Sequence, residues 1–228
     1  APGRGGAAVF RVVAGRAAVG AGDSAVTVVA DISGWLALVR QEPLEAAARD
    51  VTGTANLLVE GFRYLRLDGV ILGWVSGSRE TWAECARRMV ARLGRERVWG
   101  AVPGPLGRIA TGVDPWDAED AAGAEVEDWA KLGVGGVVVD EPSASPDILR
   151  RHEPLLRQAT HYDLRVLLAV GTGPPPDPGP WWAVAVPGGQ PPWWTLADRW
   201  DRYAGAGVVL RWPTAIPLEE AQRLAQRP

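Results

Sequence analysis

Short apolar runs alternate with longer amphipathic segments along the chain. The runs span residues 7–14, 26–32, 69–76, 97–103, 135–140, 165–170, 181–186 and 207–212. Two of them, around Val138 and Leu168, are apolar at nearly every position. Continuous apolar runs of this length are typical of strands that are buried on both faces, as in a parallel sheet covered by helices.

Between the runs, apolar residues recur with the spacing of a helix that buries one face. The segments with this spacing are 43–66, 79–93, 117–132, 146–159, 195–204 and 217–227. Ser78 and Asp117 are suitable N-caps for two of these helices, and Gly94 and Gly133 are suitable C-terminal stops.

The alternation predicts an α/β fold of the (β/α)8 TIM-barrel type, in one domain over residues 1–228. Two places depart from a regular barrel. Residues 1–25 leave no room for a helix and predict an N-terminal strand or hairpin, and the proline-rich loop at 173–180 is too short for a crossover helix. We therefore expect a reduced or irregular barrel, with a doubly wound open sheet as the alternative.

Composition argues against several classes of protein. The 228 residues are 47% hydrophobic and 22% charged with a net charge of −3, so no basic excess favours nucleic acid. No apolar run approaches the ~20 residues that cross a bilayer. Residues 1–6 lack the pattern of a signal peptide, so we expect a cytoplasmic protein without a membrane partner. The single cysteine, Cys85, excludes an internal disulfide and a multi-thiolate metal site.

Two residue frequencies are unusual. The 24 basic residues include one lysine, Lys131, which we expect at the surface, so Schiff-base chemistry is not expected. Twelve tryptophans accompany two phenylalanines, and most should be core or interface residues. The Trp pairs at 181–182 and 193–194 are flanked by prolines. They favour either a loop packed over the barrel or a surface for a homodimer or protein partner.

The common catalytic motifs are missing or out of context. The G-x-G-x-x-A match at residues 20–25 precedes a predicted strand, so it lacks the helix that would bind a pyrophosphate. Neither a P-loop nor a G-x-S-x-G motif occurs. His152 and His161 fall in or just after segment 146–159, on its polar side, which predicts solvated or capping histidines rather than zinc ligands. We therefore predict neither a metal nor a cofactor.

One pair of acids stands at the carboxyl end of a predicted strand, where the reactive groups of α/β barrels lie. Asp140 and Glu141 directly follow the apolar run at 134–139. Burial should raise the pKa of at least one of the two carboxyl groups, as a general acid or base near neutral pH requires. Because side chains alternate along a strand, one should point to the barrel axis and the other to the helices. A helix cap with a surface salt bridge is the alternative.

Three segments resemble one family in their order and spacing. Residues 97–112 contain a strand and a Gly-Pro-Leu turn, residues 135–155 contain a strand, the turn DEPSAS and a helix, and residues 43–73 contain a helix and a strand beginning at Asp68. With Arg40-Gln41, which resembles a decarboxylase substrate loop, they are similar to the uroporphyrinogen decarboxylase superfamily over residues 35–215. That superfamily includes the methylcobamide:coenzyme M methyltransferases, and cobalamin-independent methionine synthase has a similar barrel. The resemblance implies a barrel.

The chain departs from the superfamily at two sites. The decarboxylases have an essential Asp after the strand that here reads GVILGWVSG, where Trp74 and Ser76 stand instead. The methyltransferases bind zinc through a His-x-Cys on the strand that here reads LLAVGTG, which contains neither ligand. Both departures argue against the superfamily's own reactions, because a shared fold does not transfer a reaction.

We therefore predict a metal-independent enzyme that acts on a small, carboxylate-bearing metabolite by acid–base chemistry of the decarboxylase, lyase or isomerase type. Asp140 or Glu141 would be the acid or base. Arginines would bind the carboxylate, and tryptophans and polar turn residues would line the pocket. These substrate-binding residues are Arg40, Trp74, Ser76, Gly104, Arg108, Thr172, Trp181 and Trp182. The alternatives are a binding or accessory barrel without catalysis, and a methyltransferase that activates a thiol or amine directly.

Overall fold

The computed structural model describes residues 28–31, 35, 39, 50–73, 79–142, 148–170, 182–187, 207–211 and 216–226. The strands in these residues are β1 (Val28–Asp31), β2 (Gly69–Leu72), β3 (Val98–Pro103), β4 (Gly136–Glu141), β5 (Arg165–Val170), β6 (Trp182–Pro187) and β7 (Gly207–Arg211). The helices are α3 (Val51–Tyr64), α4 (Arg79–Leu93), the 3-10 turn η1 (Arg95–Arg97), α5 (Pro105–Ala110), α6 (Pro115–Lys131), α7 (Ile148–His161) and α9 (Leu218–Ala225).

The described strands form one parallel sheet that curls on itself. They hydrogen-bond in chain order, and β1 also pairs with β7, with Val29 opposite Val209. The sheet therefore has an inner face and an outer face, and its carboxyl ends lie together. This confirms the predicted α/β class with a parallel sheet, whereas an eighth strand stays a prediction.

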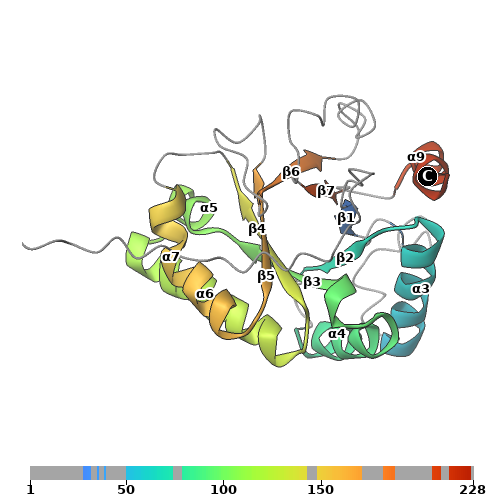
Figure 1. The fold of residues 1–228 in the computed structure, drawn as a ribbon, viewed down its shortest axis with the longest axis horizontal. Coiled ribbons are helices and arrows are strands. Elements are labelled where there is room, and N and C mark those ends of the chain that lie inside the picture. Colours follow the sequence, from blue (N-terminus) through green and yellow to red (C-terminus); the bar gives the residue numbers. More distant parts are fainter. Residues whose placement is uncertain are drawn as a thin grey trace, which may run out of the picture.

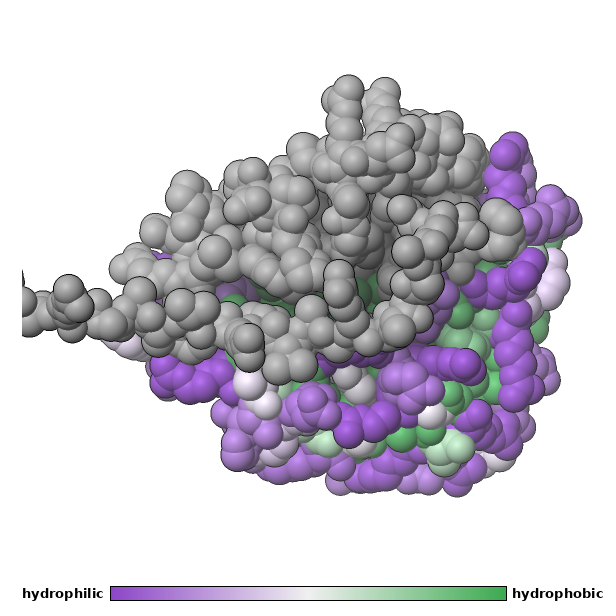
Figure 2. Space-filling view, viewed as in Figure 1, coloured by the Kyte–Doolittle hydropathy of each residue, from purple (hydrophilic) through white to green (hydrophobic). Residues whose placement is uncertain are grey.

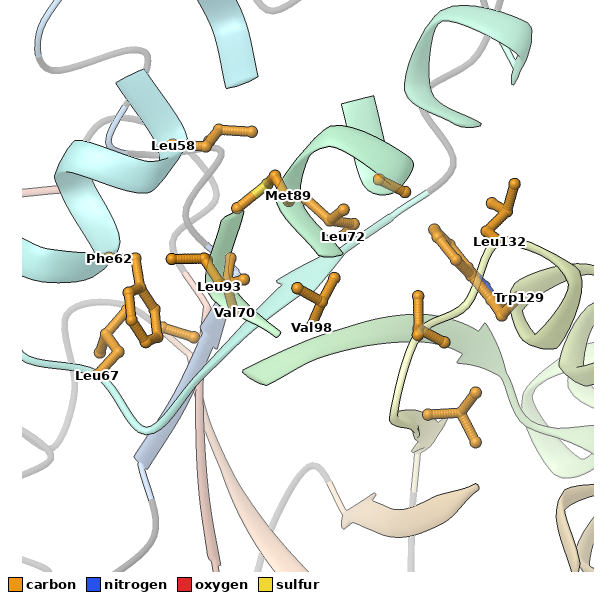
Figure 3. Close-up of a cluster of buried hydrophobic side chains, with 14 of the residues drawn as sticks. Leu58, Phe62, Leu67, Val70, Leu72, Met89, Leu93, Val98, Trp129 and Leu132 are labelled. Carbon is orange, nitrogen blue, oxygen red and sulfur yellow. The ribbon is translucent and has the colours of Figure 1, made fainter. Parts of the chain in front are cut away.

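Helices cover the outer face of the sheet. In Figure 1, α5, α6 and α7 lie on one side of β4 and β5, and α3 and α4 lie on the other side, below β2. Leu58 of α3 and Met89 of α4 are fully buried with Leu72 and Val98 of the strands, as Figure 3 shows. Since burying one such side chain contributes about 1.5–3 kcal/mol, this layer supplies most of the hydrophobic stabilisation.

Tryptophans pack directly on glycines in this layer. The Trp129 ring lies against Gly100 of β3, and its indole N–H donates to the carbonyl of Ala101 at 3.0 Å. Trp35 lies against Gly61 of α3 in the same way. A Cβ at either glycine would collide with the indole ring, so the close contact requires glycine. These tryptophans are core residues, as predicted for most of the twelve.

Most of the predicted elements are confirmed. Seven of the eight apolar runs are strands, with ends that agree within about four residues. Gly94 and Gly133 follow α4 and α6 with φ of 87° and 82°, the left-handed conformation of helix stops. The first run at 7–14, the hairpin within 1–25, the Ser78 cap, the loop at 173–180 and the helix at 195–204 lie outside the described residues.

Two predictions about helix starts are wrong, because the helix predicted from residue 43 has its N-cap at Asp50 and the cap predicted at Asp117 is misplaced. The N-cap of α6 is Asp114, whose side chain accepts a hydrogen bond from Trp116 N at 2.9 Å, and Asp117 lies inside the helix. The correct signal is Pro115, because proline is favoured in the first turn of a helix, where its missing N–H costs nothing. The short helix α5 was predicted only as a turn.

The surface of the described region is mostly hydrophilic in the view of Figure 2, with smaller hydrophobic areas between the charged residues. Lys131 is exposed, as predicted, and its ammonium lies 2.8 Å from the Glu127 carboxylate. No helix in the described part of the chain is both long enough and apolar enough to cross a membrane.

Candidate functional site

The inner face of the sheet changes in character from one end to the other. The buried residues on the inner face form one hydrophobic cluster, the inner cluster, made of Val29, Ile71, Trp99, Val138, Leu167 and Ala169, with Ala101 packed against it. Trp99, near the amino end of β3, is 3% exposed. The cluster continues through aliphatic residues to the small Ala101 and Ala169, which lie toward the carboxyl ends of β3 and β5. The inner side chains thus become smaller in the direction in which α/β sheets carry their sites.

Asp140 lies on this inner face at the carboxyl end of β4. It is two residues after Val138, an inner-cluster residue, and pairs in register with Pro103 and Ala169. It is half-buried. Asp31, the last residue of β1, has the same placement, because Val29 two residues earlier also belongs to the inner cluster. Among the side chains that the structure describes, the inner face therefore ends in two carboxylates, of which the sequence pattern singled out one.

Glu141 lies on the opposite, outer face and is fully engaged there. Its carboxylate accepts hydrogen bonds from the backbone N–H groups of Leu106 at 3.3 Å and Gly107 at 3.1 Å, in the first turn of α5. His152 Nε2 of α7 lies 2.6 Å from Glu141 Oε1, and both side chains are 0% exposed. The two faces of β4 therefore separate the acids as strand alternation predicts, Asp140 to the inside and Glu141 to the helices.

The prediction that His152 is a solvated or capping residue is wrong. His152 is completely buried between α7 and the sheet, with its Nε2 close to the Glu141 carboxylate. Helical spacing placed it on the polar side, and no sequence signal indicates a polar contact with a strand end eleven residues earlier. His161, by contrast, is exposed, and its ring meets Tyr162 edge-on at 4.8 Å.

Gly104 packs against the Glu141 carboxylate and the end of β4. Its N–H donates to the carbonyl of Asp140 at 2.8 Å. A Cβ at this position would collide with the Glu141 carboxylate and lie 2.7 Å from the same carbonyl. The Gly-Pro-Leu-Gly sequence therefore holds β4 and the start of α5 together, and the contact of Gly104 with substrate stays a prediction.

Arg108 is held by neighbours within the protein. Its Nε donates to the carbonyl of Pro103 at 3.1 Å, and its guanidinium forms an ion pair with Glu125 of α6. Both charged side chains are about one-fifth exposed. This geometry ties α5 to α6 and directs the guanidinium away from the inner face.

The remaining predicted substrate-binding residues lie outside the described region. They are Arg40, Trp74, Ser76, Thr172 and Trp181, and of Trp182 only the backbone position at the start of β6 is described. The structure thus brings Asp140, Glu141, Gly104 and Arg108 together around the carboxyl end of β4 and leaves the rest as predictions.

Comparison with known proteins adds no family. No family model matches the chain, and no curated protein matches it. Within the described residues, no group of three or more His, Cys, Asp or Glu side chains is arranged to hold a metal ion. The chemistry of the site must therefore be argued from its own residues.

Proposed function

We propose that this chain is an enzyme of the uroporphyrinogen decarboxylase-like type whose active site lies at the carboxyl end of the sheet. It acts on a small carboxylate-bearing metabolite by acid–base chemistry, in a decarboxylation, another lyase step or an isomerisation, within a reduced or irregular (β/α)8 barrel. The chemistry uses the carboxylates of the chain itself.

The observation that carries the proposal is the opposite placement of two adjacent acids. Asp140 is half-buried at the inner carboxyl end, above the small residues Ala101 and Ala169. Glu141 is fully buried, its oxygens accept hydrogen bonds from two backbone amides, and Oε1 lies 2.6 Å from His152 Nε2. A general acid or base needs access to substrate, and of the two only Asp140 combines partial exposure with an inner position.

Glu141 and His152 are positioning residues in this proposal. Their contact, together with the α5 amides, fixes the backbone of β4 at the residue next to Asp140. A fixed backbone restricts the rotamers open to Asp140, which is how supporting residues maintain a reactive geometry. Arg40 stays the proposed partner of the substrate carboxylate, since the guanidinium of Arg108 is directed to Glu125.

The test compares wild-type protein with Asp140→Asn in an extract of small metabolites, followed by mass spectrometry. Wild-type protein should deplete a carboxylate-bearing compound over time, and Asp140→Asn should reduce that rate by about 10²–10⁴-fold, the contribution of a positioned acid or base. Thermal unfolding should show that the variant remains folded.

Two outcomes would contradict the proposal. Equal depletion by wild-type protein and Asp140→Asn would remove this residue from the mechanism. A metabolite that raises the melting temperature of both proteins but is never converted would instead support a binding barrel without catalysis, because a ligand of the native state stabilises it by mass action.

A further inference from the structure

Asp31 lies opposite Asp140 in the ring of described strands. The strands pair in chain order and β7 pairs back to β1, so two strands separate β1 from β4 on one side and three on the other. Val29 and Val138, two residues before each aspartate, belong to the inner cluster. Because side chains alternate along a strand, both carboxylates point inward, from opposite sides of the interior.

The register shows at which height the two carboxylates lie. A line of paired residues runs from Asp31, the last residue of β1, through Ile71 and Trp99 to Gly136, and continues to the first residue of β5. The line therefore descends from the carboxyl end of the sheet to its amino end. With strands about 4.8 Å apart and tilted by about 36°, the residue of β4 that is level with Asp31 lies about three positions beyond Gly136. This position is about one residue from Asp140, so the two acids are nearly level.

Both aspartates have the burial that proton transfer to a substrate requires. Each is half-buried, whereas Glu141 is buried on the outer face. Each also interacts with another group of the protein. An ionised carboxylate accepts hydrogen bonds at about four lone-pair sites, so such a contact orients the acid and leaves further sites for a substrate.

We propose that Asp31 and Asp140 transfer protons on opposite faces of the substrate, in an isomerisation that inverts the carbon next to the substrate carboxylate. This inference rests on the proposed function and selects one of its reaction types. One ionised aspartate removes the proton of the C–H bond, and the electron pair of that bond moves into the adjacent carboxylate. The other aspartate, which is protonated, donates its proton to the opposite face, where a new C–H bond forms. Exchange with solvent then restores both protonation states.

The opposite placement favours inversion over the other reaction types. In a decarboxylation, one acid protonates the carbon that loses CO₂, and a second acid on the far wall has no step to perform. In an inversion, one proton leaves from one face and another arrives on the opposite face, so each step needs its own positioned acid or base. A substrate carbon between Asp31 and Asp140 meets one carboxylate on each face.

Solvent exchange in D₂O tests the proposal, with the full chain and an extract of small metabolites as the probe. Chiral chromatography with mass spectrometry should find a carboxylate-bearing compound that gains deuterium and whose two stereoisomers interconvert. Each isomer is then incubated separately. Asp31→Asn should slow the interconversion by at least ~10²-fold and label only one isomer, and Asp140→Asn should label only the other, because each remaining acid exchanges the proton of one face.

Two further variants serve as controls. Asp120→Asn changes an exposed aspartate of α6 and should leave interconversion and labelling unchanged. Asp31→Glu keeps a carboxyl group at the position and should label both isomers at a lower rate. This second variant decides the test if Asp31→Asn does not fold, which thermal unfolding would show.

The possible failures are distinguishable. Interconversion at the wild-type rate in Asp31→Asn, labelling of the same isomer by both asparagine variants, or labelling of a single isomer by Asp31→Glu would remove Asp31 from the mechanism. A compound that the wild-type protein depletes with loss of CO₂ would leave the proposed enzyme in place and overturn the inversion. The absence of any depleted or labelled compound would contradict both.

Discussion

The two ends of the inner face differ in what fills them. At the amino end, Trp99 packs between Gly69 and Gly136, where a Cβ on either glycine would collide with its ring. Arg165 lies over the ring at 4.4 Å from its centroid, a cation–π contact. At the carboxyl end, the inner positions hold alanines and carboxylates instead. A large side chain packed against glycines stabilises the fold, whereas small and ionisable side chains leave space and reactive groups for a substrate.

The two faces of β4 serve different purposes, because the inner face leads to the proposed active site and the outer face packs against the helices. The inner residues of β4 run from Gly136, which accommodates Trp99, to Asp140 at the proposed active site. Its outer residues run from Val137 and Val139 in the main core to Glu141 under α5 and α7. Variants at the two ends should therefore affect stability and chemistry separately.

The largest expected loss of stability comes from Trp99→Ala. Removing a fully buried tryptophan leaves a cavity between the two glycines and should lower the free energy of unfolding by about 3–5 kcal/mol. Trp99→Phe is the control, and it should cost less, because the Trp99 N–H has no hydrogen-bond acceptor among the described residues. Urea denaturation measures both. A loss below ~1 kcal/mol in Trp99→Ala would show that the amino end is not held in this way.

Glu141→Gln should have the next largest effect. It replaces the carboxylate beside His152 Nε2 and weakens the acceptor of the α5 amides, so the free energy of unfolding should fall by about 2 kcal/mol. His152→Gln and the double variant complete a thermodynamic cycle, in which the two changes should not be additive, because the residues are in contact. Additive losses would contradict the contact. Compared with Asp140→Asn, this variant should retain more turnover.

Cys85, a buried residue of α4 in the main core, should make stability depend on alkaline pH. Burial raises the pKa of its thiol to about 12, so the folded chain keeps a proton that the unfolded chain loses above its ordinary pKa near 9. Stability should therefore fall with rising pH between about 9 and 12, by up to ~1.4 kcal/mol for each pH unit from this group. Cys85→Ala should lack this component. Equal pH slopes for the two proteins, from urea titrations at pH 8 to 10.5, would argue against a buried thiol.

The smallest effect is expected from Asp163→Gly at the amino end. Asp163 has a left-handed backbone, and its carbonyl, which a glycine keeps, accepts from Arg95 at 3.1 Å. Relief of the strain should raise the free energy of unfolding by about 0.5 kcal/mol, less than for most residues because aspartate tolerates this conformation. Thermal unfolding measures the change, and a clear destabilisation would show that the Asp163 side chain contributes contacts of its own.

The hydrophobic pattern predicted the parallel sheet because strands buried on both faces must be apolar throughout, and that requirement is local. The same pattern located α4 from Arg79 to Leu93 and ended it at Gly94, since helical spacing and left-handed glycine are also local properties. Strand alternation further predicted that Asp140 and Glu141 point to opposite faces, although not which of them faces inward.

The tertiary structure decided which distant residues meet. The contact of Glu141 with His152 and the α5 amides depends on how two helices return to one strand end, which no local spacing encodes. Local propensity and burial determine the order of strands and helices. The partners of each buried polar group depend instead on packing, because only the tertiary structure brings distant donors and acceptors within contact distance.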